Sequence, residues 1–552
     1  MTGPVSILRW GRDPFRVLAT LAVAAFIAAG CGSAQGDAVA ADLTATAHAA
    51  SECADAFVPL DLPHVTSGPG NTASTFDGTG AGVGVADLDA DGDLDLVLPN
   101  LSGDSNILEN NGGLSFTPRS LQVGRFRGVA TVDVDVDGWT DVVLTTGIGP
   151  PVVFTNPGSG ELNGFVRTRL DGVDAATYSM AWADLGGDGD LDLVTGSYNA
   201  ELTLLRNSPV LGSNTGVVLH ERLDDGTFAV ERLAESAQAL ALITPDLNAD
   251  GRTDIMVGND LATPDQIWLA TDDGFERTEP FSTTSYSTMS LDAADIDNDG
   301  TPEIFSTDMK PATPDDRYRE VEADLAAAPV VDDIQTPENV LLSRSGDGWD
   351  NMAPGFGVDA TGWSWSGLFG DLDNDGALDL YVATGMRSDQ LFDFLPDARL
   401  VEENRAFRGD ADFAPVPEWG LDDPAGGRGV AFADLDDDGD LDVVVNNLDE
   451  PARMFENRLC GGVAMTVELR WAGSGNPAAL GSTIEFIADD VTRSRAITSS
   501  RGYLSSDPSE AHVGLGSADS VDLRITWPDG RVTSFDDQPT AQHLVVTRTA
   551  EK

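Results

Sequence analysis

Lysine is nearly absent from this chain of 552 residues, which carries it only at Lys310 and Lys552. Lysine and arginine together number 32, against 92 acidic residues. Phosphate groups would be repelled by such a surface, and no basic stripe interrupts it, so nucleic acid is excluded as a partner. A saline habitat, high solubility and a cationic partner all remain open as reasons for the acidity.

Histidine and cysteine are also scarce, with five and three residues, and they do not cluster along the sequence. Zinc sites are usually built from these residues at short spacings, so no zinc motif is present. No nucleophile motif stands out, and the acids are too numerous to nominate a catalytic pair. We therefore predict that the chain is not an enzyme, with a hidden hydrolase or lyase as the alternative.

Long apolar runs are missing except near the start, where Arg9, Arg12 and Arg16 precede an apolar stretch over residues 17–29. This stretch is too short for a permanent membrane helix, so we predict a signal peptide over residues 1–30. Its end, Ala-Ala-Gly followed by Cys31, resembles a bacterial lipobox with Cys31 as the lipidated first residue. Gly32 resembles outer-membrane sorting, which predicts an outer-membrane lipoprotein facing the periplasm or the cell surface. Plain cleavage and secretion is the alternative.

Residues 31–56 are rich in Ala, Ser, Thr and Gly and are expected to form a flexible tether. Apart from the N-terminal lipid, we expect no contact with the membrane. Cys53 lies just before the first acidic repeat described next, and Cys460 lies just after the last. In an oxidising compartment, a disulfide between them would join the two ends of a ring, and we put this forward as a hypothesis.

An acidic phrase, Asp-x-Asp-x-Asp-Gly-x-x-Asp, is present in abundance and recurs seven times between apolar runs. The third copy has Gly186 at its third position, and the fourth has Asn248 there. The candidate ligands at positions one, three, five and nine are Asp87, Asp89, Asp91 and Asp95; Asp133, Asp135, Asp137 and Asp141; Asp184, Asp188 and Asp192; Asp246, Asn248, Asp250 and Asp254; Asp295, Asp297, Asp299 and Glu303; Asp371, Asp373, Asp375 and Asp379; and Asp434, Asp436, Asp438 and Asp442.

Oxygen ligands at these positions, with a backbone carbonyl expected at position seven, are suited to Ca²⁺. The glycine at position six permits the tight reversal that turns the oxygens inward. Without an ion, the crowded carboxylates would repel one another. We predict about five to seven calcium sites, with the third and fourth copies in doubt. For a single degenerate copy, an acidic turn that binds nothing is the alternative.

The copies begin at residues 87, 133, 184, 246, 295, 371 and 434, a spacing of roughly 46 to 76 that is typical of propellers and solenoids. β-rich runs flank each copy. We therefore predict an all-β fold, with a seven-bladed β-propeller over residues 57–459 and a small β-sandwich over residues 460–552. The widest gap contains residues 315–325, which predict a short helix in an inserted loop.

The acidic repeats resemble FG-GAP or VCBS repeats, the calcium-binding propeller units also found in integrin α heads. Four phrases near the C-terminus, over residues 476–481, 502–506, 512–516 and 527–530, resemble the ASPIC and UnbV domain. Together they resemble a bacterial member of the cartilage acidic protein family. The resemblance implies an extracellular role in interaction, with an undefined partner.

The predicted function is a non-catalytic interaction or adhesion scaffold whose partner is a protein or a glycan at the cell surface. The alternative is a carbohydrate-binding or polysaccharide-processing envelope protein. Trp363 and Trp365 alternate in an apolar run and could stack on sugars. Packing of both rings inside a blade is the plainer interpretation.

Overall fold

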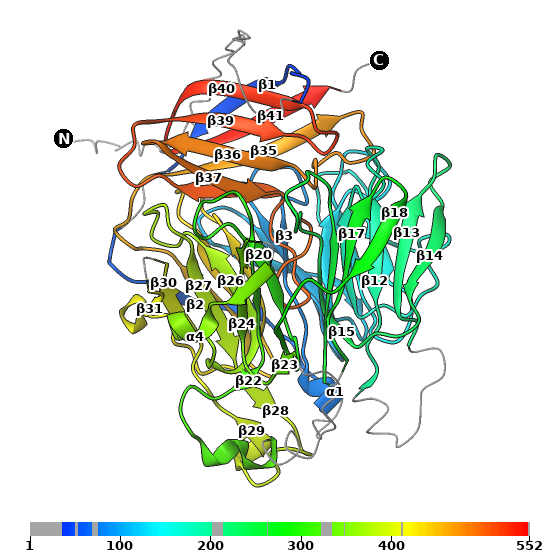
Figure 1. The fold of residues 1–552 in the computed structure, drawn as a ribbon, viewed down its shortest axis with the longest axis vertical. Helices are drawn as coiled ribbons and strands as arrows, with labels where there is room; N and C mark the ends of the chain where they lie inside the picture. The colour runs from blue at the N-terminus through cyan, green and yellow to red at the C-terminus, as the bar shows by residue number, and fades with distance from the viewer. Residues whose placement is uncertain are drawn as a thin grey trace, which may run out of the picture.

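The computed structural model describes residues 36–49, 53–68, 75–200, 214–261, 263–321, 334–346, 348–409 and 412–549. Within these residues, seven sheets of four or five strands are followed by a domain of two four-stranded sheets (Figure 1). The apolar runs beside each acidic phrase form the strands, because their β-branched and large apolar residues suit a buried pleated surface.

In chain order, the seven sheets consist of β3 (Gly84–Ala86), β4 (Asp95–Leu98), β5 (Asp104–Asn110) and β6 (Phe116–Val123); β7 (Val129–Val132), β8 (Asp141–Leu144), β9 (Val152–Thr155) and β10 (Val166–Thr168); β11 (Ser179–Ala183), β12 (Asp192–Gly196), β13 (Val217–Arg222) and β14 (Phe228–Ala234); β15 (Ala239–Ile243), β16 (Ile255–Asn259), β17 (Gln266–Thr271) and β18 (Gly274–Thr278); β20 (Leu291–Ala294), β21 (Glu303–Ser306), β24 (Val340–Ser345) and β25 (Gly348–Asn351); β22 (Met309–Lys310), β26 (Gly362–Gly370), β27 (Asp379–Thr384), β30 (Arg405–Arg408) and β31 (Ala414–Pro415); and β32 (Gly427–Ala433), β33 (Asp442–Asn447), β34 (Pro451–Glu456) and β2 (Val58–Val65). Short elements between them are α1 (Thr75–Gly78), β19 (Thr284–Ser285), η1 (Asp316–Tyr318), β23 (Gln335–Thr336), α4 (Ala353–Phe356), β28 (Met386–Arg387), η2 (Pro396–Ala398), β29 (Arg399–Leu400) and η3 (Pro417–Trp419).

The seven sheets form a closed ring. Their innermost strands contact one another in the order β3, β7, β11, β15, β20, β26, β32 and again β3. The seventh sheet is completed by β2 from the start of the chain, which pairs with β34 so that Leu60 faces Met454. Hydrophobic clusters fill the space between neighbouring sheets; one of them joins Leu96 to Val444. The fold is therefore a β-propeller, as predicted, and we interpret each sheet as one blade.

The C-terminal domain is a sandwich of two sheets that lies over one end of the ring (Figure 1). Its sheets have the orders β1 (Asp42–Ala47), β41 (Gln542–Thr549), β35 (Ala464–Ala472), β38 (Glu510–Gly514) and β37 (Val491–Ala496), β36 (Thr483–Ala488), β39 (Ser520–Thr526), β40 (Val532–Pro539). Apolar side chains such as Val467, Phe486 and Trp527 form the core between them.

The prediction of a flexible tether over residues 31–56 is wrong for residues 42–47. These residues form β1, which pairs with β41 so that Leu43 faces Val546. Leu43 and Ala45 pack against the core of the C-terminal domain and alternate with threonines. This period of two is a strand pattern, which the Ala- and Thr-rich composition concealed.

A segment of the C-terminal domain, residues 499–507, passes through the centre of the ring, and we call it the axial segment. It is hydrogen-bonded to the innermost strand of every one of the seven sheets. The bonds run from Val85 N–H to the Ser506 carbonyl, Val129 N–H to the Leu504 carbonyl, Ser499 Oγ to the Trp182 carbonyl, Ser500 Oγ to the Leu242 carbonyl, Gly502 N–H to the Leu291 carbonyl, Tyr503 N–H to Ser366 Oγ, and Phe432 N–H to Asp507 Oδ1. The two domains are thus joined along the propeller axis.

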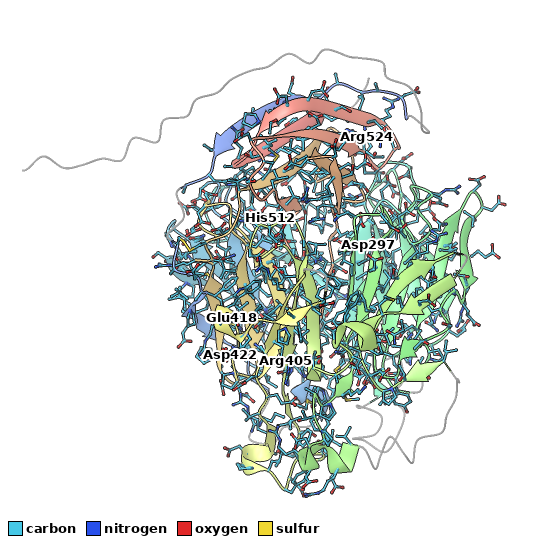
Figure 2. All side chains as sticks on the ribbon, turned by 60° about the vertical axis from the view of Figure 1, so that its left-hand side comes forward. Asp297, Arg405, Glu418, Asp422, His512 and Arg524 are labelled. Atoms are coloured by element: carbon cyan, nitrogen blue, oxygen red, sulfur yellow. A yellow bond between two sulfur atoms is a disulfide. The ribbon has the colours of Figure 1, made fainter. Side chains whose placement is uncertain are left out.

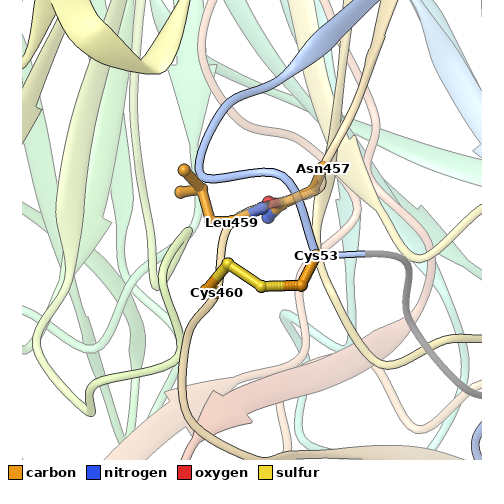
Figure 3. Close-up of a disulfide and its surroundings, with 4 residues drawn as sticks. All are labelled: Cys53, Asn457, Leu459 and Cys460. Atoms are coloured by element: carbon orange, nitrogen blue, oxygen red, sulfur yellow. Dashed lines mark hydrogen bonds between the residues drawn. A yellow bond between two sulfur atoms is a disulfide. The ribbon is translucent and has the colours of Figure 1, made fainter.

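Cys53 and Cys460 form a disulfide, with the pairing that the sequence predicted (Figure 3). Their Cα atoms lie 5.0 Å apart. Of the helix predicted over residues 315–325, the structure shows the 3₁₀ turn η1 and helical backbone over residues 319–321, and residues 322–325 lie outside the described residues. The predicted signal peptide and Cys31 lie outside the described residues. Among the residues described, no helix has the length and apolar composition that a membrane crossing requires.

Candidate metal centres

Each acidic loop connects the innermost strand of a sheet to its second strand, as between β3 and β4. All seven loops therefore lie at the same edge of the ring. Positions four and six have left-handed backbone in every copy, for example Ala90 with φ 60° and Gly92 with φ 95°. These two reversals turn the side chains at positions one, three and five toward the inside of the loop.

The first-position carboxylate accepts hydrogen bonds from the backbone of its own loop. In the second copy, Asp133 accepts from the N–H groups of Asp137 at 3.1 Å and Gly138 at 2.8 Å. The fifth-position carboxylate accepts from position seven, as Asp137 does from Trp139 at 2.9 Å. Some of the carboxylate oxygens therefore hold the shape of the turn by accepting backbone hydrogen bonds. An acidic turn that binds no metal, the alternative interpretation, would use them in the same way.

The ninth-position carboxylate has a role that the sequence did not reveal. Asp95 is buried, and its two oxygens accept the N–H groups of Leu88 at 3.1 Å and Asn110 at 2.9 Å. In five other sheets the same pair of hydrogen bonds links the loop to the third strand, through Asp141, Asp192, Asp254, Asp379 and Asp442. In the remaining sheet, Glu303 accepts the N–H of Ile296 and the hydroxyl of Ser343.

Asparagines that end the third strand in three sheets connect each loop to the loop before it. Asn110 Nδ2 donates to the Leu435 carbonyl at 2.8 Å, Asn156 to Leu88 at 2.7 Å, and Asn457 to Leu372 at 2.7 Å. Leu435, Leu88 and Leu372 each occupy position two of the neighbouring loop. The recurrence of Asn fifteen residues after the ninth-position acid was the signal that could have revealed this contact.

The structure tests whether the loops suit a hard dication. Carboxylate oxygens from three residues of one loop lie within 4.8 Å of one another in sets that include Asp87, Asp89 and Asp95; Asp133, Asp135 and Asp141; Asp295, Asp297 and Asp299; and Asp371, Asp373 and Asp379. Asp87 Oδ1 and Asp371 Oδ1 are buried and have no hydrogen-bond partner. Clustered carboxylate oxygens with free lone pairs are the donors that Ca²⁺ prefers, so these loops fit the ion.

Electrostatics supports the same conclusion. Burial raises the pKa of Asp95 to about 8, and Asp89 and Asp87 add to the effect. Burial likewise raises the pKa of Asp141 to about 7 and that of Glu303 to about 7. In these surroundings a bare carboxylate is costly, because it has lost water and faces like charges. A bound cation would supply the missing counter-charge.

The two degenerate copies differ from the others. In the third, the N–H of Gly186 donates to Asp192 Oδ2 at 2.9 Å, where other copies have a third-position side chain. In the fourth, Asn248 Nδ2 donates to Asp250 Oδ2 at 3.1 Å, so this amide presents a donor to its neighbour. These contacts are the physical reason to rank both loops below the other five as metal sites.

The C-terminal domain lies directly on the sixth and seventh loops. Gly514 N–H donates to Asp371 Oδ2 at 3.0 Å, and Arg493 Nε donates to the Gly376 carbonyl at 3.1 Å. His512 Nε2 lies 3.0 Å from the Gly439 carbonyl. The candidate metal loops are therefore part of the contact between the two domains.

Trp363 and Trp365 do not form an exposed platform. Their residues are 3% and 2% exposed, and they belong to a cluster with Tyr178 and Tyr503. Trp365 Nε1 donates to the Gly385 carbonyl at 2.7 Å. Both rings are packed in the interior, as the plainer interpretation expected, but their neighbours come from several sheets and from the axial segment and not from one blade.

Parts of the chain match models of known protein families. The model of the FG-GAP-like repeat matches residues 87–144, 133–195, 246–306 and 402–445, and the model named ASPIC and UnbV matches residues 472–552. The chain carries FG-GAP-like repeats and an ASPIC and UnbV domain. The resemblance predicted from sequence is confirmed for both kinds of unit.

Two solved structures of BBS1N in complex with ARL6DN, soaked with mercury and with lead, are also similar to this chain. Each is 10% identical to it and covers 74% of it, and the matches span 98% and 97% of the solved chains, with TM-scores of 0.42 and 0.39. No curated protein matches the chain.

Proposed function

We propose that this protein is an exported, calcium-stabilised β-propeller that acts as a non-catalytic interaction or adhesion scaffold in the cell envelope. The observation that carries the proposal is the clustering of carboxylate oxygens from three acids of one loop, which occurs in the first, second, fifth and sixth loops at one edge of the ring. Ca²⁺ bound there would supply positive charge to the acids and rigidify the loops. A preformed surface binds a partner with a smaller loss of conformational entropy.

A lipid on Cys31 belongs to the same proposal and would hold the scaffold at the outer membrane. The most direct support is the lipobox-like sequence that ends the predicted signal peptide. The Cys53–Cys460 disulfide agrees with an oxidising compartment outside the cytoplasm. Mass spectrometry of the native protein should find a diacylglycerol-modified Cys31 at the mature N-terminus, and an unmodified later N-terminus would contradict the anchor.

Calcium removal tests the central part of the proposal. The mature protein, purified in calcium, should retain several ions by elemental analysis, and EGTA should lower its melting temperature. Calcium added back should restore melting, while magnesium should do so poorly because it demands a smaller octahedral site. A protein that retains no calcium and melts identically in EGTA would refute the proposal.

The partner can be approached by cross-linking from the native envelope, with a glycan array in parallel. The scaffold proposal expects a specific protein or glycan that binds in calcium and is released by EGTA. Trp363 and Trp365 are buried, so they do not support the carbohydrate-binding alternative. Cleavage of any glycan in a polysaccharide panel would contradict the non-catalytic role.

A further inference from the structure

A polar face of the C-terminal domain brings together histidines that are far apart in the sequence. On β35, Met465 and Val467 point into the domain core, so Thr466 and Glu468 lie on the opposite face. Thr466 is paired both with His512 of β38 and with His543 of β41. Residues paired across a sheet point to the same face, and the two histidines therefore flank Thr466.

Two acids lie on the same face, two residues along their strands from Thr466 and His512. Glu468 is paired with Glu510 of β38, and the side chains of both lie on the face that carries His512. Glu468 Oε2 lies 3.9 Å from His543 Nε2. The side chains of His543 and Glu468 are 32% and 29% exposed, so this part of the face lies close to the surface.

His48 joins the row from the N-terminal strand. Thr46 of β1 is paired with His543, and His48 follows two residues later, with its N–H donating to the Ala541 carbonyl at 3.2 Å. Its side chain is only 4% exposed, and Nδ1 lies 3.5 Å from Asp434 Oδ2 of the seventh loop. Figure 2 shows His512 at the boundary between the C-terminal domain and the propeller.

Each of these three imidazoles has a buried ring nitrogen without a hydrogen-bond partner. The unpartnered atoms are His48 Nε2, His512 Nδ1 and His543 Nε2, and Thr466 Oγ1 beside them is also unpartnered. The large majority of buried side-chain polar atoms find a partner in folded proteins. Several unpartnered lone-pair atoms on one small face therefore point to a ligand that would satisfy them.

The orientation of His512 is the one that metal-binding histidines commonly have. Nε2 donates to the Gly439 carbonyl at 3.0 Å, which fixes the proton on that nitrogen and leaves the Nδ1 lone pair free.

We propose that His48, His512 and His543, with Glu510 as a carboxylate ligand, bind one transition-metal dication of the zinc class. Three imidazoles and one carboxylate form a nitrogen-rich donor set that zinc accepts and calcium does not favour. The site is separate in its donors from the all-oxygen loops. It would connect the N-terminal strand, the C-terminal domain and the edge of the seventh loop.

Zinc binding in the presence of saturating calcium tests the site, because calcium occupies the acidic loops. The full-length mature protein should retain about one equivalent of zinc, and Co²⁺ should give visible absorption bands typical of nitrogen and oxygen ligands. His512→Ala and His543→Gln should each weaken zinc binding by at least about 10-fold. Circular dichroism should show that both variants fold.

His64→Gln is the matched control. His64 is also 4% exposed, but both of its ring nitrogens have partners, Thr66 Oγ1 at 3.0 Å and Asn106 Nδ2 at 2.9 Å. This variant should bind zinc like the parent protein. Absence of retained zinc, or equal retention by His512→Ala and His543→Gln, would overturn the site. Calcium measured in the same samples would show whether the proposed function fails independently.

Discussion

At the scale of the residue, Val136 occupies position four of the second acidic loop with φ 59°. A left-handed backbone is costly for a β-branched side chain, because Cβ approaches the carbonyl oxygen. Asn298 and Asn374 occupy the same position in other loops, with φ 60° and 56°, and asparagine tolerates this conformation. Val136 is 38% exposed, so little packing depends on it.

Val136→Asn should therefore stabilise the protein by about 1 kcal/mol, by relief of backbone strain. The change can be measured by chemical unfolding in calcium. Val123→Asn serves as the control, since Val123 is 61% exposed and lies in the strand β6, where asparagine is disfavoured. A gain of equal size in both variants would show that backbone strain is not the cause.

Asp265 is a buried acid outside the acidic loops, directly before β17. Burial raises its pKa to about 7, although it accepts hydrogen bonds from Asn259 N–H and Thr288 Oγ1. Between about pH 4 and pH 7 the folded state keeps a proton that the unfolded state has released, so stability falls as pH rises. Asp265→Asn does not titrate. Its free energy of unfolding relative to that of the parent protein should therefore rise between pH 5 and pH 8, by on the order of 1 kcal/mol or more.

Urea unfolding at both pH values, in saturating calcium, measures the effect. Asp273→Asn, at an exposed turn position, is the control and should show the same difference from the parent protein at both pH values. An Asp265→Asn variant whose stability relative to the parent is independent of pH would contradict the assigned ionisation.

At the scale of the element, the acidic loop combines two kinds of carboxylate. Those at positions one, three and five serve the candidate metal site, while the ninth adds an oxygen to that site and also fastens the loop to the third strand of its sheet. Both kinds look alike in sequence, since each is an acid at fixed spacing. Replacement of one carboxylate of each kind separates their roles.

Asp95→Asn should lower the free energy of unfolding by about 1 to 3 kcal/mol even in EGTA, because one buried N–H of Leu88 or Asn110 loses its acceptor. Asp89→Asn keeps the oxygen that accepts Asp91 N–H and removes a like charge, so in EGTA it should not destabilise. Asp89→Asn should lower the free energy of unfolding only in the presence of calcium. Equal destabilisation by both changes in EGTA would contradict this division.

The repeats could be predicted because the motif is local: oxygens at fixed spacing and a glycine reversal lie within nine residues. Calcium binding, inferred from the same spacing, stays a prediction. The pairing of β1 with β41 was missed because the two strands lie at opposite ends of the chain. The row of His48, His512 and His543 was missed for the same reason, since only strand register brings them together. The phrase containing Tyr503 was recognised, but its partners are backbone and side-chain groups that lie far away in the sequence.

At the scale of the whole molecule, the axial segment holds the two domains together. Tyr503 is fully buried, its ring lies 5.1 Å from that of Trp365, and its hydroxyl lies 2.8 Å from that of Tyr178. Arg501 pairs with Asp292 at 2.7 Å and with Asp507 at 2.9 Å. Both polar and apolar contacts therefore join the segment to the ring.

Tyr503→Ala should cost about 3 to 5 kcal/mol by opening a cavity at the axis. Calorimetry should then resolve separate transitions for propeller and C-terminal domain, and limited proteolysis should release the latter. Tyr503→Phe keeps the packing and should cost only about 1 kcal/mol. A single unchanged transition in Tyr503→Ala would show that the segment does not couple the domains.

Closure of the ring by β2 also has a consequence for synthesis. β2 pairs with β34, and β1 pairs with β41, so both strands are made first and find their partners last. Until then their backbone edges are open to other chains, which is a route to aggregation. The nascent polypeptide must keep these early strands apart from its neighbours until the final residues arrive, so a holding chaperone would benefit its folding.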